Sequence, residues 1–152
     1  MPTRVIQVMI FSTLPWVELR LAIPFGIAKG LHPVVAGLAA VTASWVVILP
    51  MFLILDLFYA RWLSRNPLIR HAVEEVRSRG RSYVERWGVL GVGIYVSLPI
   101  PGPGVYSGAI LAWLFGLPRR QAILALAMGV LVSAFLVTLI STGVIAIVRR
   151  FI

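Results

Sequence analysis

The stretch Ser97-Leu-Pro-Ile-Pro-Gly-Pro-Gly-Val-Tyr-Ser-Gly108 places prolines and glycines inside a sequence that is apolar enough to lie in a bilayer. A membrane tolerates such a break in a helix only where protein or a water-filled cavity satisfies the freed N–H and C=O groups. Breaks at membrane depth are typical of substrate or ion sites in transporters. The stretch therefore predicts two half-helices that meet at a functional site inside a membrane.

The composition supports a membrane protein. Hydrophobic residues make up 60% of the chain and charged residues only 12%, and the mean hydropathy is +0.97. Two stretches, Pro33 to Ala60 and Gln121 to Val148, each contain 28 residues, whereas about 20 residues cross a bilayer. We expect an all-α polytopic membrane protein with one domain over residues 1–152. The chain has no cysteine, which excludes disulfides, thiol catalysis and cysteine-ligated metals.

The positive charge is concentrated in one segment. The net charge is +9, and 7 of the 14 basic residues lie between Arg61 and Arg86. Short loops rich in arginine remain on the cytoplasmic side and lie against anionic lipid headgroups. We therefore expect residues 61–87 to form a basic cytoplasmic segment that contacts membrane lipids, and we expect no nucleic-acid partner.

A short pattern occurs in both halves of the chain. The stretch Ile23-Pro24-Phe-Gly26-Ile-Ala-Lys-Gly30 parallels Ile100-Pro101-Gly-Pro-Gly104-Val-Tyr-Ser-Gly108. In each half a proline turn, at Pro33 or Pro118, and a long apolar span follow. The pattern predicts two repeats, residues 3–60 and 88–150, each with a re-entrant helical hairpin and one full transmembrane helix. Gly26, Gly30 and Gly108 are expected to be helix-packing positions.

The two repeats must have opposite orientations if each crosses the membrane once. The basic segment 61–87 would then join them on the cytoplasmic side of the cell membrane, and both termini would lie outside. An alternative stays open, because residues 3–22 could also form one full span. With only two full spans, the fold has little internal volume and is compatible with a homodimer.

Two charged residues lie within the first predicted hairpin. Glu18 and Arg20 stand between Pro15 and Pro24, and each costs about 2.5–3.5 kcal/mol at the centre of a membrane helix. Residues two apart in a helix point to different faces and do not pair easily. Either the backbone unwinds between the prolines, or each charge finds a partner elsewhere, for instance as an ion pair that connects the hairpins. Glu18 is the residue best suited to proton coupling, because burial and a neighbouring arginine act in opposite directions on a carboxyl pKa.

The second hairpin is expected to contain a helix that starts near Val105. Helix starts carry unpaired N–H groups and partial positive charge, so a phosphate or carboxylate binds there readily, with Arg20 expected to face it. The hydroxyl groups of Tyr106 and Ser107 either contact the ligand or only pack and bind backbone. The candidate substrate- or proton-binding residues are Glu18, Arg20, Pro24, Pro101, Gly102, Pro103, Gly104, Tyr106 and Ser107. Asp56 is a secondary candidate, with an interfacial carboxylate as the alternative.

A resemblance to a known family rests on three of these blocks. They are Glu18-Leu-Arg20-x-Ala22-Ile23-Pro24-x-Gly26, Pro99-Ile-Pro-Gly-Pro-Gly-Val-Tyr-Ser-Gly108 and Leu114-Phe-Gly-Leu-Pro118. Together they resemble the small multidrug export protein family, which is related to the DedA superfamily, from about Pro15 to Gly129. The resemblance implies two opposed re-entrant hairpins that meet at mid-membrane, with Glu18 and Arg20 as the charged residues of the first hairpin. Superfamily relatives are linked to the movement of polyprenyl phosphate or phospholipid. DedA-type proteins carry a further arginine beside the second break, where Pro103 and Tyr106 stand here.

Three classes of function follow for testing. The first is a secondary transporter or flippase, coupled to protons, that binds an anionic lipid-phosphate headgroup between the hairpin tips. The alternatives are a small-molecule or multidrug exporter and a membrane scaffold or assembly factor that transports nothing. No HExxH, serine–histidine or cysteine arrangement is present, so we expect no enzyme. His32 and His71 are too scattered for a metal site, and no cofactor is expected.

Overall fold

The computed structural model describes residues 2–63, 65–100 and 104–151, and within these ranges every regular element is a helix. The predicted all-α class is therefore confirmed. In chain order, the elements are α1 (Pro2–Ser12), α2 (Glu18–Ala28), α3 (Pro33–Phe58), the π-helix η1 (Tyr59–Leu63), α4 (Pro67–Ser97), α5 (Val105–Leu114) and α6 (Arg119–Phe151).

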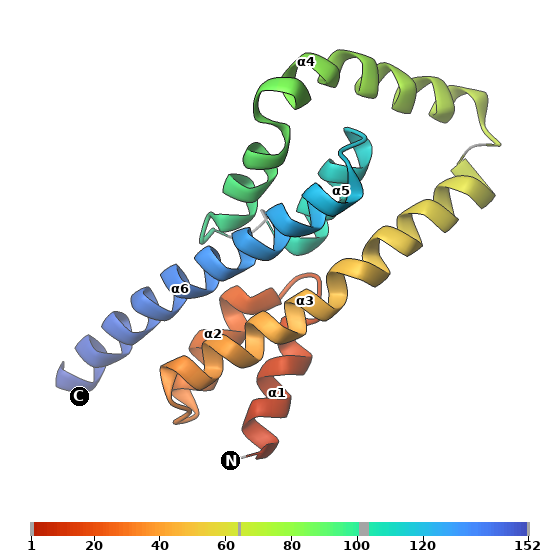
Figure 1. Ribbon diagram of the computed structural model, residues 1–152. Helices are drawn as coiled ribbons and strands as arrows, with labels where there is room; N and C mark the ends of the chain where they lie inside the picture. Colours follow the sequence, from red (N-terminus) through yellow and green to blue (C-terminus); the bar gives the residue numbers. More distant parts are fainter. Residues whose placement is uncertain (1, 64, 101–103, 152) are drawn as a thin grey trace.

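The two long helices α3 and α6 run side by side in opposite directions. Three contacts show this order: a side chain at Gly37 would approach the Thr138 hydroxyl to 3.2 Å, Trp45 donates to the Ala127 carbonyl, and Asp56 pairs with Arg119. Figure 1 shows α3 in yellow-orange and α6 in blue, with both chain termini at one end. The connection from α3 to α4 lies at the opposite end.

Both long helices are apolar over a length that crosses a bilayer. Their candidate spans, Pro33–Arg61 and Arg119–Ile147, contain 29 residues each and have hydropathies of 2.4 and 2.7. Large apolar side chains face outward along them, for example Val46 (69% exposed) and Phe135 (64% exposed). Water-soluble proteins rarely expose such rows, whereas hydrocarbon solvates them. The outward faces of α3 and α6 therefore suit contact with lipid.

The first two helices form a hairpin. α1 ends at Ser12 and α2 begins at Glu18, so residues 3–22 do not form one continuous helix. The two helices approach closely at Gly26, where a Cβ would lie 2.6 Å from Val8 Cγ2. Pro24 lies inside α2 instead of ending it. The alternative of a single span over residues 3–22 is therefore wrong.

Both α2 and α5 end in the same type of glycine turn. Gly30 and Gly116 adopt φ values of +84° and +68°, a conformation that glycine allows without a Cβ penalty. The N–H groups of the next residues, Leu31 and Leu117, each donate to the carbonyl five residues earlier, with an N–O distance of 3.0 Å. This bond is expected for a Schellman cap. Gly30 therefore ends a helix and is not a helix-packing position.

Gly108 has a different place in its half of the chain. It lies inside α5, where a Cβ would overlap Val96 of α4 and come within 2.8 Å of Leu126 of α6. The two Gly-xxx-Gly motifs thus occupy different positions: Gly26 and Gly30 lie near the end of α2, and Gly104 and Gly108 lie at the start of α5. The elements that do correspond are the turns at Gly30-Leu31 and Gly116-Leu117.

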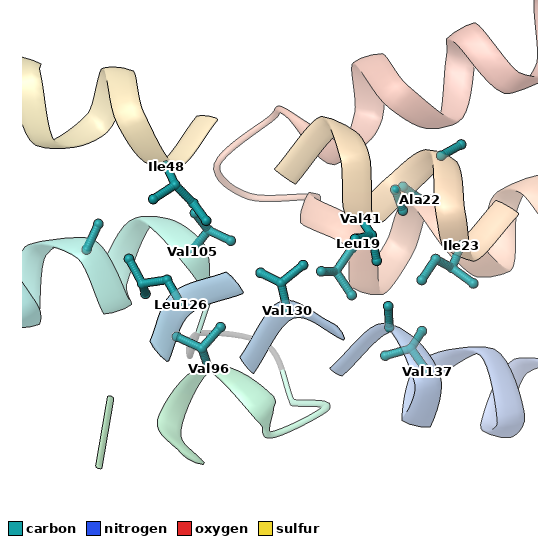
Figure 2. Close-up of a cluster of buried hydrophobic side chains, with 14 of the residues drawn as sticks. Leu19, Ala22, Ile23, Val41, Ile48, Val96, Val105, Leu126, Val130 and Val137 are labelled. Carbon is teal, nitrogen blue, oxygen red and sulfur yellow. The ribbon is translucent and has the colours of Figure 1, made fainter. Parts of the chain in front are cut away.

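The buried core connects the two halves of the chain. Figure 2 shows Leu19 and Ile23 from α2 close to Val130 and Val137 from α6. Val96 from α4 and Val105 from α5 lie nearby. These side chains are at most 6% exposed. Small residues along α5, among them Ala109 and Ala112, are fully buried, so the short helix packs tightly between its longer neighbours.

The helix α4 has two parts with different surroundings. Figure 1 shows its first part crossing the end of the bundle opposite the termini, after which the helix turns and its second part runs beside α5 and α6. At Gly129 of α6, a Cβ would lie 2.7 Å from the Gly93 carbonyl and 2.9 Å from Val96 Cβ. This close approach brings the end of α4 directly against α6.

Candidate functional site

Glu18 and Arg20 form a buried ion pair where the two helical hairpins meet. Arg20 Nη1 lies 2.7 Å from Glu18 Oε2, and the two side chains are only 10% and 12% exposed. Two unlike charges removed from solvent stabilise a structure only when further hydrogen bonds satisfy their remaining donors and acceptors. Both side chains meet that condition through the second hairpin.

The Glu18 carboxylate lies at the start of α5. It lies against the backbone N–H groups of Val105 and Tyr106, which belong to the first turn and have no partner within the helix. The first turn of α5 contains no acidic residue of its own, so Glu18 provides the negative charge that a helix N-terminus favours. The carboxylate thus occupies the position predicted for an anionic ligand.

Gly104 makes room for this carboxylate. Its backbone is extended and needs no glycine for conformational reasons, but a Cβ built there would overlap the Glu18 carboxyl group. Glycine is therefore required for the close approach of the glutamate to the helix start. The sequence predicted Gly104 as a candidate binding residue beside the break, but it did not predict that this glycine makes room for the Glu18 carboxylate.

Arg20 binds the other side of the break, at the end of α4. Its Nη2 donates to the carbonyls of Val96 at 3.0 Å and Leu98 at 2.7 Å, and its Nε donates to Leu98 at 3.2 Å. The last carbonyls of a helix lack internal partners and carry partial negative charge. The last turn of α4 contains no basic residue. Arg20 therefore faces the end of α4, not the start of α5 as predicted.

Glu18 and Arg20 pair although they are two residues apart. The reason is the backbone at Glu18, whose φ of +46° is left-handed and costs energy for any residue except glycine. Glu18 begins α2, so its side chain does not follow the regular helical direction. The predicted difficulty of pairing applies to a regular helix and fails here, because the backbone departs from one at this residue.

The two candidate hydroxyl groups bind backbone. Tyr106 donates to the Thr13 carbonyl in the loop between α1 and α2. Ser107 Oγ accepts from the Gly104 N–H at 2.8 Å, which caps the start of α5. The tyrosine thus adds a second connection between the hairpin tips, whereas the serine acts within its own. Pro101, Gly102 and Pro103 lie outside the described residues.

A cleft opens beside the ion pair. It has a volume of about 490 Å³ and is lined by Glu18 and Arg20 together with Pro15, Trp16, Val17, Leu21 and Pro99. Trp16 is 93% exposed. A cleft lined by apolar residues and one charged pair suits an amphipathic ligand, since most ligand sites combine apolar walls with few polar groups.

Asp56 forms a second charged cluster at the opposite end of α5. Its Oδ1 accepts from Trp113 Nε1 at 2.9 Å, and its Oδ2 pairs with Arg119 at the start of α6. Tyr59 packs edge-on against Trp113 with ring centroids 5.1 Å apart. Asp56 is 38% exposed and lies outside the cleft beside Glu18. It therefore connects α3, α5 and α6, and the structure does not bring it together with the other candidates.

Trp113 and Arg119 were missed as partners of Asp56. Their contact depends on how α3 packs against α5 and α6, for which the sequence carries no signal. Within the described residues, no group of three or more His, Asp or Glu side chains could bind a metal ion.

Two apolar helices of membrane-spanning length, outward apolar faces and a buried ion pair at the meeting point of two broken helices define a helical membrane protein. A family model described as "Putative small multi-drug export protein" matches residues 18–136. The chain therefore belongs to this family, whose description indicates small-molecule export. No curated protein and no solved structure matches the chain. The relation to the DedA superfamily stays a prediction.

We predict that Gly104→Ala destabilises the protein. The added methyl group displaces the Glu18 carboxylate from two N–H groups, and a hydrogen bond to a charged group contributes about 1.5–3 kcal/mol. The matched control is Gly91→Ala in α4, where the added Cβ would lie 3.9 Å from Trp87 Cβ and alanine improves helix propensity. Thermal unfolding in detergent should show a loss for the first variant only. Equal effects would mean that Gly104 does not make room for the carboxylate.

We predict that Trp113→Phe costs about 1.5–3 kcal/mol of stability, because it removes a hydrogen bond to a charged carboxylate while keeping an aromatic ring against Tyr59. Trp45→Phe is the control, since Trp45 Nε1 donates to the neutral carbonyl of Ala127 at a distance of 3.3 Å. Denaturant titration of both variants in the same detergent measures the difference. A larger loss for Trp45→Phe would contradict the importance of Asp56.

Proposed function

We propose that this protein is a proton-coupled secondary transporter that binds the anionic headgroup of an amphipathic substrate between two re-entrant hairpins, and that it is not an enzyme. The observation that carries the proposal is the buried Glu18–Arg20 pair, which bridges the tips of both hairpins. A charged pair at membrane depth needs a functional or structural reason, and this one lines an open cleft.

Helix lengths support the re-entrant arrangement. α1 and α2 contain 11 residues each and α5 contains 10, which corresponds to about 16 Å at 1.5 Å per residue. The hydrocarbon core is about 30 Å thick. Such helices reach only part of the way across, so the hairpin of α1 and α2 returns to the side from which it entered.

Inverted repeats account for the order of the elements. Each half has a hairpin, a Gly-Leu turn and one long apolar helix, and the long helices run in opposite directions. In transporters, repeats of this type bring broken helices together at a midplane site. With residues 61–87 on the cytoplasmic side of the cell membrane, both termini lie outside.

The proposed transport step exchanges one anion for another. A phosphate or carboxylate headgroup displaces the Glu18 carboxylate from the N–H groups of α5 and binds Arg20, and the apolar part of the substrate occupies the cleft beside Trp16. A carboxylate that loses these donors in an apolar site takes up a proton, because an isolated buried charge is costly. Binding of the substrate and protonation of Glu18 are thereby linked. Phospholipids and polyprenyl phosphates have this chemistry.

Two other functions predict different results. The family description favours a small-molecule exporter, for which a cationic drug would bind the Glu18 carboxylate in place of Arg20. A scaffold would use the ion pair only to connect the hairpins. The substrate charge and the effect of the pair on transport separate the three.

The test is transport in liposomes with purified protein, using polyprenyl phosphate or a cationic drug as substrate together with a pH-sensitive dye. We expect Glu18→Gln and Arg20→Ala to lower polyprenyl-phosphate flux at least about tenfold, since each removes charged hydrogen bonds of about 1.5–3 kcal/mol. The control is Glu74→Gln, because Glu74 pairs with Arg70 on the exposed surface of α4. This variant should transport at the wild-type rate.

Each outcome selects one function. Drug-dependent proton flux with no lipid flux would favour the exporter of cations and contradict the anionic substrate. Wild-type transport by folded Glu18→Gln and Arg20→Ala would contradict the whole proposal. No flux of either substrate, with destabilised variants, would favour the scaffold.

A further inference from the structure

We propose that the first part of α4, residues 67–78, is an in-plane membrane anchor that docks its apolar face on a surface of anionic phospholipid. This inference does not depend on transport, and it concerns a surface at the end of the bundle opposite the termini.

The apolar residues of this segment lie on one side of the helix. Leu68, Ile69, Ala72, Val73 and Val76 follow each other at alternating spacings of one and three residues, which places them on one face. Together with Leu114 of α5, they line an apolar groove of about 290 Å³.

This face is open to its surroundings. Leu68 is 78% exposed and Ile69 and Val76 are each 36% exposed, whereas Val73 is buried. A continuous apolar surface of this kind indicates a partner. Because the groove is lined by apolar side chains only, hydrocarbon is a suitable partner.

The opposite face of the helix is charged. Arg70 and Glu74 are exposed and lie 3.6 Å apart, one helical turn from each other, and His71 and Glu75 are exposed beside them. Within residues 67–78 two arginines balance two glutamates, so the excess of positive charge comes from the flanking sequence: residues 61–87 contain seven arginines against three glutamates. This excess of positive charge on both sides of the segment complements anionic headgroups.

The segment also lies at the depth where headgroups are expected. Arg61 and Arg119 stand at the ends of the two long apolar helices, and arginines in such positions mark the membrane interface. Pro67 follows Arg61 by six residues, a distance of at most about 20 Å along the chain. Leu114, which shares the groove, precedes Arg119 by five residues.

The helix direction agrees with an in-plane position. Figure 1 shows this part of α4 crossing the end of the bundle and not continuing the direction of α3. Asn66 caps its start by accepting from the Leu68 N–H at 3.0 Å, so the helix begins independently of α3. Helices with one apolar face and one charged face lie in the interface with the apolar side toward the acyl chains.

The test uses fluorescent labels on single cysteines, because the chain has none of its own. Ile69→Cys on the apolar face and His71→Cys on the charged face are labelled in the full-length protein and reconstituted into vesicles. Brominated lipids then report contact with acyl chains. In vesicles containing phosphatidylglycerol, we expect severalfold stronger quenching at position 69 than at position 71. The difference should shrink in pure phosphatidylcholine and at high salt, which screens surface charge.

Two charge variants are measured in the same quenching experiment, at the phosphatidylglycerol content that gives half-maximal quenching at position 69. At this content a small change in docking has the largest effect. Arg70→Gln should lower the ratio of docked to undocked segment about fivefold, which corresponds to about 1 kcal/mol for one positive charge at an anionic surface. Glu74→Gln should raise the same ratio, because it removes a negative charge. Equal quenching at positions 69 and 71, or quenching that does not depend on anionic lipid, would overturn the proposal. A label at position 69 that is shielded from both brominated lipid and aqueous iodide would assign this face to a second copy of the chain instead.

Discussion

The contact between the Glu18 carboxylate and the first N–H groups of α5 is the interaction on which the rest of the structure depends. A broken helix inside a membrane leaves N–H groups at one end of the break and carbonyl groups at the other, and lipid can satisfy neither. In this chain, two residues of the first hairpin satisfy both ends of the break in the second. Glu18 binds the N–H groups of α5, and Arg20 binds the carbonyls of α4. The ion pair between them then compensates the two charges. The left-handed backbone at Glu18 is the cost of this geometry.

The short helix α5 is bound by a carboxylate near each end. Glu18 contacts its first turn, and Asp56 accepts from Trp113 in its last turn. Both carboxylates come from the first half of the chain, and Arg119 balances the second as Arg20 balances the first. Between these ends, α5 buries small residues against its neighbours. A change in the charge or position of either carboxylate therefore acts on the whole helix, which makes α5 the element that joins the central site to the end of the bundle at Asp56.

Much of this arrangement could be predicted from the sequence, because it follows from local patterns. Apolar length identified α3 and α6, and the proline-glycine run located the start of α5 near Val105. The contacts that decide the site could not be predicted in the same way. The expectation that Arg20 faces α5 failed because the Glu18 carboxylate lies at the start of α5, while Arg20 binds the carbonyls at the end of α4. The pairing of the glycine motifs failed because Gly30 ends a helix while Gly108 lies within one, a difference that depends on φ and not on residue type.

The most direct test of this account is amide hydrogen exchange at Val105 and Tyr106, measured in the wild type and in Glu18→Ala. These two N–H groups belong to the first turn of α5 and have no acceptor within the helix. If the Glu18 carboxylate binds them, both should be protected in the wild type and exchange much faster in the variant, while amides in the middle of α5 keep their protection. Fast exchange in the wild type, or no change in Glu18→Ala, would contradict the claim that this carboxylate connects the two hairpins.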